Sequence, residues 1–372
     1  MTARLPERFS LKEYPAMPFS ADIEPQVHTR FLSGIAALVE LPILQRQSDR
    51  SRGLSTAGLI SGYRGSPLGT YDQQLWKARD RLKAAGIEFQ PGLNEDLAAT
   101  ALWGAQMHKA FGETRVDGVF GIWYGKGPGV DRSGDVFRNA NILGTSKLGG
   151  VLAIGGDDHA AQSSMFPHQT DGIFQSVMMP VLQPSSVQEI IELGRAGIEL
   201  SRYCGSWVAF KTIAEIVESS TTVSISDETR IWNTPERPLP RHGLNWDPAI
   251  RWPEERYELE RRQVEERLPA AIDWIRANRI NAPVFKPAAT RLVLATCGKA
   301  HQDTLQALSD LGLDRQALAL LGIGIYKFGC SWPVSASDVL DGFPGAEEIL
   351  VIEEKAPTIE DQLKAGLYGR QN

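Results

Sequence analysis

The chain has 372 residues, a formal net charge of -6, and hydrophobic and charged fractions of 42% and 23%. At roughly 100–200 residues per domain this length predicts two domains, and the composition is that of a soluble globular protein. The acidic balance and the lack of a long basic run argue against a nucleic-acid partner, whose phosphates require clustered Lys and Arg. The first residues lack the apolar core of a signal peptide, and no apolar run approaches the ~20 residues of a membrane span. We therefore expect a cytoplasmic enzyme without a membrane partner.

The three cysteines, Cys204, Cys297 and Cys330, lie far apart in the sequence. None belongs to a Cys-x-x-Cys pair, the spacing that commonly marks a zinc site or an iron–sulfur cluster. We expect buried thiols, so any redox cofactor of the cluster type would have to reside outside this chain.

The first half of the chain predicts an α/β domain. A helix is expected from Thr29 to Leu41, where apolar residues recur at helical spacing until Pro42 ends or kinks it. From Leu54 to about Ser226, short apolar runs alternate with helical patterns, as a parallel sheet requires when crossover helices cover its faces. The expected strands are Ala57–Ser61, Ile87–Gln90, Val116–Trp123, Gly150–Ile154, Met179–Leu182 and Trp207–Lys211. The expected helices lie near Tyr71–Ala85, Glu95–Ala110, Val136–Leu143 and Val187–Tyr203.

The second half of the chain begins with a segment that is rich in proline and charged residues. Residues 231–287 combine several prolines with a highly charged helix, EERYELERRQVEERL, ahead of Pro269, and its apolar positions keep no heptad. We expect a linker with one exposed surface helix. In residues 288–372, predicted strands and helices alternate again, and we expect a shorter α/β domain there. Its expected elements are the strand RLVLATCG, a helix over Lys299–Leu311, the strands ALALLGIGI and ILVIEE, and a helix from Thr358.

Glu95 stands at a predicted helix start. The side chain of Asn94 can cap this helix, and Glu95 and Asp96 both suit its positive end, so the pair of acids alone would be ordinary helix punctuation. Small residues on several faces of the helix let neighbouring backbone approach closely, which would hold the first-turn acid rigidly. The following strand ends in GKGPG, where open α/β sheets bind ligands. The acid and this loop are expected to face one cleft.

Two glycine-rich segments follow predicted strands. SGYRGSPLG, residues 61–69, leaves backbone N–H groups free to meet a phosphate, carboxylate or ring, or is simply a crowded turn. GKGPGVDRSGD, residues 125–135, could supply cations to a substrate carboxylate, or be a solvated loop. Neither has the spacing of a GxGxxG or P-loop motif, which argues against nucleotide binding by those routes.

A third segment, GGDDHAAQSSMFPHQTD at residues 155–171, gathers Asp157, Asp158, His159, His168 and Asp171. Imidazole and carboxylate groups could ligate a divalent metal. They could also form a Ser–His–Asp arrangement with Ser163 or Ser164, although no GxSxG elbow is present. Loop-ordering hydrogen bonds and contact with a substrate are the remaining alternatives. We assign no metal site here.

Several long motifs together carry a family resemblance. The motifs are LISGYRGSPLGTYDQQLW, FQPGLNEDLAATALWGAQ, DGVFGIWYGKGPGVDRSGDVFRNAN, GGVLAIGGDDHAAQSS, SVQEIIELG and ILVIEEKAPTIEDQL. They resemble the N-terminal part of the indolepyruvate:ferredoxin oxidoreductases, in their long fused bacterial form, within the thiamine-diphosphate-dependent 2-oxoacid:ferredoxin oxidoreductase family. The resemblance covers nearly the whole chain.

The resemblance implies a parallel-sheet, pyrimidine-type thiamine-diphosphate-binding domain over residues 1–230 and a smaller transketolase-C-terminal-like α/β domain over 288–372. It implies that Glu95 faces the aminopyrimidine and assists its proton transfer, which requires a dry, apolar site. By position, the implied cofactor-binding residues are Glu95, Gly62, Tyr63, Gly125 and Gly127. The implied substrate-binding residues are Ser66, Arg64, Lys126 and His159, with Lys211 at a further loop position.

The implied activity is the oxidative decarboxylation of an aryl pyruvate such as indolepyruvate. Coenzyme A takes the acyl group and ferredoxin takes the electrons. The family's GDG stretch for diphosphate and Mg²⁺ does not occur here, nor do cluster-binding cysteines. A C-terminal region outside this sequence or a separate subunit would have to supply them, in an expected homo-oligomer, and we expect the chain alone to be inactive. A catalytically silent scaffold of the same fold and a metal-dependent hydrolase remain alternatives.

Overall fold

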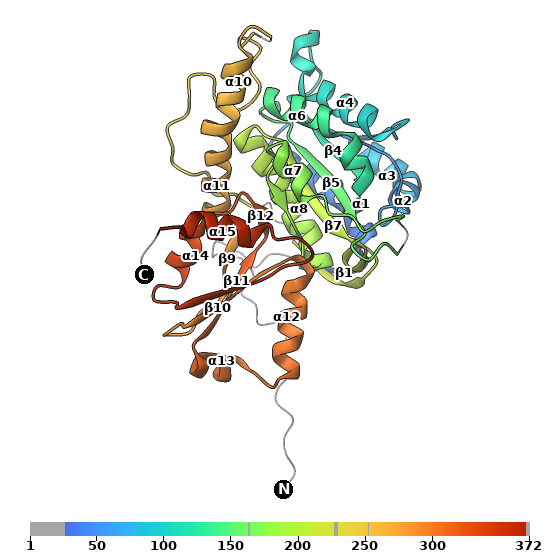
Figure 1. Cartoon of the computed structure of the whole chain (residues 1–372). Helices are drawn as coiled ribbons and strands as arrows, with labels where there is room; N and C mark the ends of the chain where they lie inside the picture. Colours follow the sequence, from blue (N-terminus) through green and yellow to red (C-terminus); the bar gives the residue numbers. More distant parts are fainter. Residues whose placement is uncertain (1–26, 163, 227–229, 252, 370–372) are drawn as a thin grey trace.

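A computed structural model describes residues 27–162, 164–226, 230–251 and 253–369, which form two α/β modules (Figure 1). Within these residues the strands make a seven-stranded sheet, a four-stranded sheet and a two-stranded ribbon. Among the described residues, none of the helices combines the length and the apolar character that a membrane span requires. The predicted α/β class, a large parallel-sheet domain followed by a smaller α/β domain, is confirmed.

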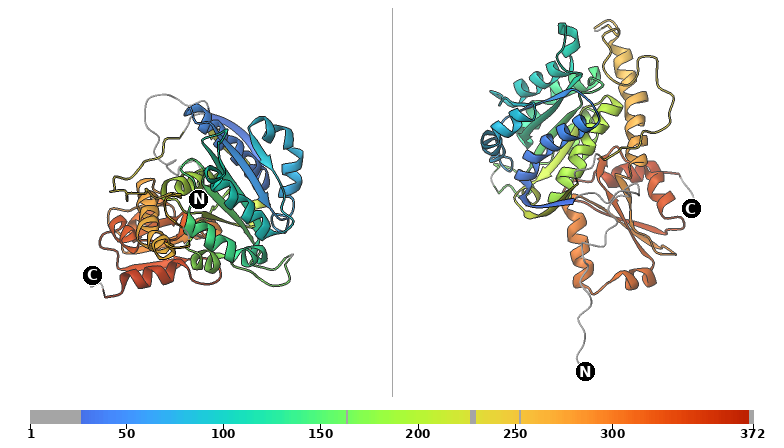
Figure 2. Two further views of the ribbon diagram at one scale, coloured as in Figure 1. Left: turned by 90° about the horizontal axis from the view of Figure 1, so that it is seen from above. Right: turned by 180° about the vertical axis from the view of Figure 1, so that it is seen from behind.

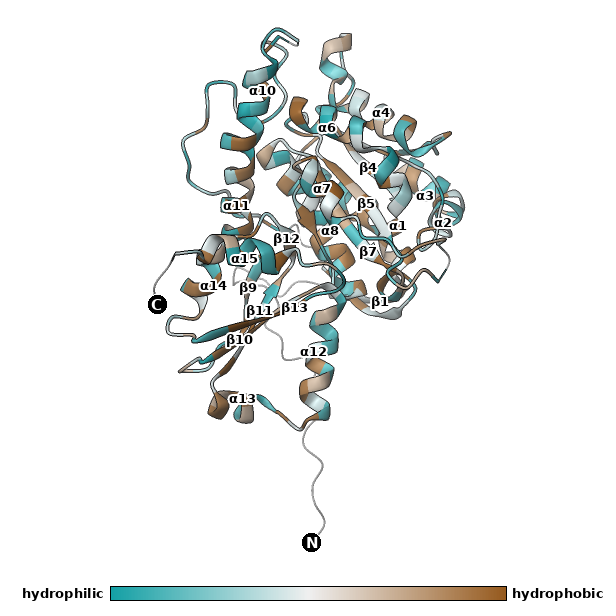
Figure 3. Cartoon of the chain, viewed as in Figure 1, coloured by the Kyte–Doolittle hydropathy of each residue, from teal (hydrophilic) through white to brown (hydrophobic). Residues whose placement is uncertain are grey.

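The seven-stranded sheet has the order β12-β6-β7-β5-β4-β2-β3. Neighbouring strands from β6 to β3 are parallel, whereas β12 joins β6 antiparallel. Its strands are β2 (Thr56–Gly62), β3 (Ile87–Phe89), β4 (Gly118–Lys126), β5 (Val151–Asp157), β6 (Val181–Leu182), β7 (Val208–Ile213) and β12 (Cys330–Trp332). Figure 3 shows hydrophobic residues along the central strands, which fits strands that are covered on both faces.

Helices cover both faces of this sheet, and the residues of β5 alternate between two cores. Leu152 and Ile154 pack with α1 (Gly34–Ser51), α2 (Tyr71–Lys77), α3 (Arg79–Ala84) and α8 (Val187–Cys204). Val151 and Ala153 pack with α4 (Glu95–Gln106), α6 (Gly134–Leu143) and α7 (Asp171–Ser176) on the other face. This period of two is what a buried strand imposes. Figure 2 shows α1 and α8 side by side from behind.

The predicted helix over Thr29–Leu41 is wrong in its first part and too short at its end. Residues Val27–Ser33 form β1, which pairs antiparallel with β8 (Ser220–Ser226). Helix α1 begins after Ser33, whose side chain accepts a hydrogen bond from the Ala36 N–H at 3.1 Å, and it continues through Pro42 to Ser51. Pro42 costs a helix hydrogen bond, but packing against α8 buries this helix and holds it together.

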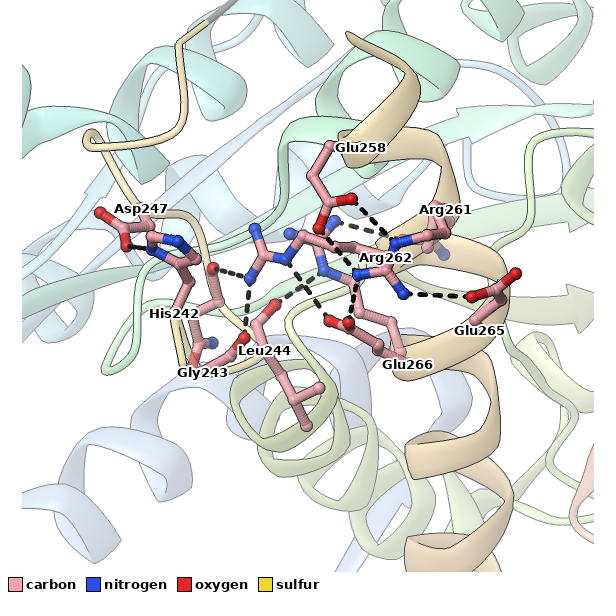
Figure 4. Close-up of polar contacts among 12 residues, drawn as sticks. His242, Gly243, Leu244, Asp247, Glu258, Arg261, Arg262, Glu265 and Glu266 are labelled. Atoms are coloured by element: carbon pink, nitrogen blue, oxygen red, sulfur yellow. Dashed lines mark hydrogen bonds and ion pairs between the residues drawn. The ribbon is translucent and has the colours of Figure 1, made fainter. Parts of the chain in front are cut away.

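The charged segment forms a continuous helical rod, α10 (Arg256–Arg262), the π-turn η3 (Gln263–Arg267) and α11 (Leu268–Ala277). On its outer face Arg261 pairs with three glutamates (Figure 4). On its inner face Arg262 and Arg267 are 1% and 0% exposed. Arg267 donates to the carbonyl oxygens of Asn141, Ile142 and Leu143 at the end of α6, which have no partner within that helix. The expectation of an exposed surface helix is therefore wrong for this inner face.

The second module has a four-stranded sheet of order β13-β10-β11-β9. Its strands are β9 (Asn281–Phe285), β10 (Leu292–Cys297), β11 (Ile323–Phe328) and β13 (Glu348–Ile352). Its helices are α12 (Gly298–Asp310), α13 (Arg315–Leu321), α14 (Ala336–Gly342) and α15 (Ile359–Leu367). The predicted strand ALALLGIGI is wrong in its first half: Asp314 caps α13, and Gly322, at φ 69°, ends that helix just before β11.

The two modules interlock. Strand β12 of the second module completes the sheet of the first, and Lys327 of β11 contacts Ser185 at 3.0 Å and Glu189 at the start of α8. All three cysteines are free and buried, as predicted. Burial raises the pKa of the Cys204 thiol to about 11, so this thiol is held in its unreactive protonated form.

Candidate functional site

The loops that follow β2, β4 and β5 meet at the carboxyl edge of the large sheet. In register, Gly62 lies beside Tyr124, and Lys126 lies beside Gly156. A Cβ atom on Gly65 would lie 2.8 Å from the Lys126 side chain, and one on Gly156 would lie 2.9 Å from Leu68. The three glycine-rich segments therefore come together, as expected for the ligand-binding edge of a parallel sheet.

Glu95 begins α4 at this edge and is only 9% exposed. Asn94 caps the helix by accepting a hydrogen bond from the Leu97 N–H at 2.9 Å, as predicted. The Trp123 indole N–H donates to the backbone oxygen of Glu95 at 2.9 Å, which fixes this turn against β4. The Glu95 carboxylate makes no hydrogen bond or ion pair with any residue that the structure describes. A positioned, nearly buried carboxylate is thus left for a ligand or partner.

The approach to Glu95 depends on Gly129 in α5 (Gly127–Arg132). A Cβ atom at Gly129 would lie 2.6 Å from Cγ of Glu95 and 2.7 Å from Oε1, closer than any side chain permits. The same short helix contacts His168 through Gly127, so α5 lies between Glu95 and the histidine loop. The role of Gly129 could not be predicted from the sequence, because it is one of three similar glycines in GKGPG.

The neighbouring acid, Asp96, behaves differently. Its carboxylate accepts a hydrogen bond from Arg132 Nε at 2.6 Å, and this bond lowers the pKa of Asp96. Both side chains are partly exposed to solvent. Of the two acids in the first turn, Asp96 is therefore hydrogen-bonded to Arg132, whereas Glu95 interacts with Arg132 only through longer-range charge attraction.

A second acidic group, Asp157 at the end of β5, is fully buried and surrounded by partners. Its Oδ2 accepts hydrogen bonds from the N–H and the hydroxyl of Thr170, at 2.9 and 3.0 Å. Lys211 Nζ lies 3.8 Å from Asp157 and 2.5 Å from Oδ2 of Asp171. His168 lies 3.5 Å away and His159 3.8 Å away. We call Asp157, His159, His168, Asp171 and Lys211 the Asp157 cluster.

The electrostatics of this cluster follow from its burial. Desolvation alone would raise the pKa of Asp157, but His159, His168 and Lys211 together hold it well below its usual value. Burial alone would lower the pKa of His159, yet the carboxylates of Asp157 and Glu354 raise it overall. The pKa of His168 is raised by Asp157, against burial, with help from Asp131. The cluster therefore favours charged histidines around a charged Asp157.

The second module reaches this cluster through the turn after β13. Glu354 Oε2 lies 3.6 Å from Nδ1 of His159, and Lys355 donates to the backbone oxygen of His159 at 3.4 Å. Gln169 exchanges two hydrogen bonds with Ala356, at 3.0 and 3.3 Å. Glu354 was not predicted from the sequence, where it is one of two adjacent acids after a strand. The contacts place both modules against the histidine loop.

The other predicted site residues lie at the same carboxyl edge of the large sheet, some buried and some exposed to solvent. Gly62 and Gly125 are buried in strands, and side chains there would collide with Tyr124 and Trp123. Tyr63 and Arg64 are exposed on the loop after β2, and Ser66 precedes Pro67 in the same loop. The predicted GKGPG loop is instead the end of β4 followed by helix α5, with Gly127 packed on His168.

For the loop that carries His159 and His168, the sequence leaves open a metal site, loop-ordering hydrogen bonds and a Ser–His–Asp arrangement. Among the described residues no group of three His, Cys, Asp or Glu side chains is arranged to hold a metal ion. Asp158 accepts hydrogen bonds from the N–H groups of Gln162 and Ser164, at 2.9 and 3.0 Å, so it orders the loop. Ser163, one of the two candidate serines for a Ser–His–Asp arrangement, lies outside the described residues.

Comparisons with known proteins identify relatives of this chain. Residues 281–372 match the family profile of the indolepyruvate ferredoxin oxidoreductase middle domain. The chain is 23% identical over 321 residues to the indolepyruvate oxidoreductase subunit IorA of Pyrococcus abyssi, covering 84% of this chain and 45% of that subunit. It is 24% identical over 316 residues to the IorA subunit of Methanothermobacter marburgensis, covering 84% and 46%. The chain thus spans less than half the length of these relatives.

A solved structure shares the fold. The 2-oxoglutarate:ferredoxin oxidoreductase of Magnetococcus marinus, determined with 2-oxoglutarate, coenzyme A and succinyl-CoA bound, matches with a TM-score of 0.62. The match covers 91% of this chain and 60% of that chain at 14% sequence identity, so it concerns the fold alone. The resemblance that the sequence motifs indicate is confirmed by these findings together: the chain is a relative of the indolepyruvate:ferredoxin oxidoreductases.

Proposed function

We propose that the chain forms the Glu95 side of the active site of a 2-oxoacid:ferredoxin oxidoreductase that oxidatively decarboxylates indolepyruvate or another aryl pyruvate. Coenzyme A would take the acyl group and ferredoxin the two electrons. The observation that supports this proposal most strongly is the Glu95 carboxylate, which is nearly buried, fixed by its helix and without a partner in the described residues. The Glu95 oxygens are not among the buried side-chain atoms that lack a hydrogen-bond partner, so the carboxylate remains accessible to a ligand.

The residues around Glu95 fit the implied cofactor, thiamine diphosphate. A carboxyl group without a protein partner can accept a hydrogen bond from a ring N–H, and the contact with Gly129 fixes where that carboxyl lies. When bound, thiamine diphosphate supplies the nucleophilic carbon that adds to the carbonyl of a 2-oxoacid. Glu95 would hold the proton at the pyrimidine ring, which is the part of the chemistry that belongs to this chain.

The loops beside Glu95 would position the substrate. Ser66 and Arg64 belong to the loop after β2, and Lys126 lies under Gly65 of that loop. The Lys126 side chain makes no hydrogen bond or ion pair with the described part of the chain. A cation and a hydroxyl at one loop are suited to the carboxylate of a 2-oxoacid. His159, held between Asp157 and Glu354, would form the adjoining wall.

The site requires a second half. The sequence contains neither a GDG stretch nor a cysteine cluster, and the chain covers 45% of the Pyrococcus abyssi subunit. We infer that the Mg²⁺-diphosphate site and the iron–sulfur clusters belong to a further region or subunit, and that the active assembly is a homo-oligomer of such units. On this account the chain alone does not turn over.

Reconstitution tests the proposed function. The chain would be assayed for viologen reduction with indolepyruvate and coenzyme A, alone and co-produced with a region equivalent to the part of the IorA relatives that it does not span. We expect indolepyruvate-dependent reduction only in the assembled sample. Reduction by the purified chain alone, or a folded assembly without activity toward any 2-oxoacid, would contradict the proposal.

A further inference from the structure

A pocket of about 780 Å³ lies at the amino edge of the large sheet, opposite the candidate active site. One wall is the turn at Lys147 and Leu148 ahead of β5, and another is the end of α8 with Arg202 and Tyr203. The segment from 230 to 247 closes it. Since β5 has seven residues, about 20 Å of strand separates this pocket from the loops around Asp157. The volume falls within the usual range for small-molecule sites.

The lining of this pocket is positively charged, although the chain as a whole is acidic. Five Arg or Lys side chains line it against two acidic ones, Glu199 and Asp247. Arg202 is also paired with the buried Asp49 behind the wall, so five positive charges face three negative ones, a local surplus of two in a chain of net charge -6. A concave site with one sign of charge concentrates ions of the opposite sign. The pocket therefore favours an anion.

Both acidic groups of the lining are already engaged. Glu199 accepts hydrogen bonds from Arg52, Arg202 and Gln45, at 3.1, 2.9 and 2.8 Å. Asp247 contacts His242 at 2.5 Å and accepts the Ala249 N–H at 2.8 Å. By contrast, neither Lys147 nor Arg241 makes a hydrogen bond or ion pair with any residue in the described ranges. These two cations remain for a ligand.

The wall that carries Arg241 is held in place by buried arginines (Figure 4). Arg262 donates to the carbonyl oxygen of Gly243, and Arg267 to that of Leu244, both at 2.7 Å. The Asn245 side chain donates to the Arg202 carbonyl at 2.8 Å, which ties the segment to α8. A wall fixed in this way lowers the ordering cost of binding, so the pocket is formed in advance.

The aromatic wall of the pocket limits the kind of ligand. Trp232 packs against Trp274 at a centroid distance of 5.3 Å, and the Arg230 guanidinium lies 4.1 Å from its ring centroid. Because Trp274 and Arg230 already pack against the Trp232 ring, a ligand has to be recognised mainly by its charge rather than by stacking of a base on this ring. Phosphate groups carry the required density of negative charge and suit both Lys and Arg.

We propose that this pocket binds a multiply charged, phosphate-bearing anion, with Lys147 and Arg241 as its contacts. The phosphates could belong to a free polyphosphate or to a nucleotide, which share this chemistry. The site stands apart from the proposed oxidoreductase function because it lies at the opposite edge of the sheet, and its test needs only the 372-residue chain.

Isothermal titration calorimetry with inorganic tripolyphosphate and with ATP, at low ionic strength, tests the proposal. A double variant, Lys147→Ala with Arg241→Ala, removes both contacts. Lys77→Ala with Lys83→Ala removes two exposed lysines of α2 and α3 and is the matched control for the change in charge. We expect the parent and the control to bind with equal affinity and the pocket variant to bind roughly tenfold more weakly.

Added salt is expected to weaken binding by the parent, because it screens the charges. Equal affinity for the two ligands would assign recognition to the phosphates alone, whereas tighter binding of ATP would favour a nucleotide, and both results support the site. The proposal is overturned if the parent binds neither ligand, or if the pocket variant binds as tightly as the control.

Discussion

Glu95 and Asp157 lie at the same edge of the same sheet, yet their surroundings are opposite. Asp157 is fully buried and accepts two hydrogen bonds from Thr170, with Lys211 and two histidines beside it. Glu95 is 9% exposed and has no partner for its carboxylate within the described residues. Asp157 has most of its partners inside the chain, although its Oδ1 accepts no hydrogen bond from a described residue, whereas the Glu95 carboxylate accepts none at either oxygen. An acid of the first kind stabilises the fold, while one of the second kind is available for binding or catalysis.

The largest effect on stability is expected for Asp157→Asn. The substitution keeps the size of the side chain but leaves the buried Lys211 and the neighbouring histidines without their shared negative charge. Breaking a buried ion pair in this way costs on the order of 3 kcal/mol. Urea unfolding of the 372-residue chain, followed by circular dichroism, measures it.

Asp96→Asn is the matched control, because it removes a carboxylate from a partly exposed pair with Arg132 at the same edge. Exposed pairs contribute little, so a much smaller change is expected. Equal losses in the two variants would contradict the structural role assigned to Asp157.

A smaller effect, of about 2 kcal/mol, is expected for Gly129→Ala. The added methyl group would lie 2.6 Å from Cγ of Glu95, so either α5 or the glutamate has to move. Thermal unfolding measures the loss, and the assembled enzyme should lose turnover as well. Gly134→Ala, where nothing lies within 4 Å of the added methyl group, is the control and should be neutral. A neutral Gly129→Ala variant would mean that the contact with Glu95 is not tight.

The smallest effect is a dependence of stability on pH near neutrality. The folded chain raises the pKa of His159 and His168 above 6.5, so their contribution is fully present below about pH 6.5 and is lost as the pH rises through the folded-state values. Unfolding free energies measured at about pH 6 and about pH 8 should fall more for the parent than for a His159→Gln, His168→Gln double variant. The same slope in both proteins would show that these histidines are not coupled to Asp157.

At the acid end the sign reverses. The pKa of Asp157 is lowered in the folded chain, so its contribution is present above the ordinary value of 3.8 and declines as the pH falls below it.

Features encoded by neighbouring residues could be predicted from the sequence. The strands of the large sheet follow from continuous apolar runs, and the start of α4 follows from Asn94 and the two acids after it. Features that depend on distant residues could not be predicted. Strand β1 forms because β8 pairs with it almost two hundred residues later, and the helix through Pro42 persists because α8 covers it.

The same distinction holds for the candidate site. The three glycine-rich segments could be predicted as ligand-binding candidates because each follows a predicted strand. Their contacts with one another depend on three-dimensional packing. Gly129 against Glu95 and Glu354 against His159 join segments that the sequence does not connect. Burial of Arg262 and Arg267 was missed for a related reason: their partners are backbone carbonyl oxygens, which leave no pattern in the sequence.

A comparison of Glu95→Gln with Asp96→Asn in the assembled enzyme distinguishes the proposed catalytic acid from the acid next to it. Both substitutions remove one carboxylate from the same helical turn and keep its size. We expect Glu95→Gln to lower indolepyruvate-dependent viologen reduction by at least about 100-fold, with unfolding of the chain nearly unchanged, and Asp96→Asn to retain most of the activity. Near-parental turnover of Glu95→Gln, or an equal loss in both variants, would show that Glu95 is not the acid of this site.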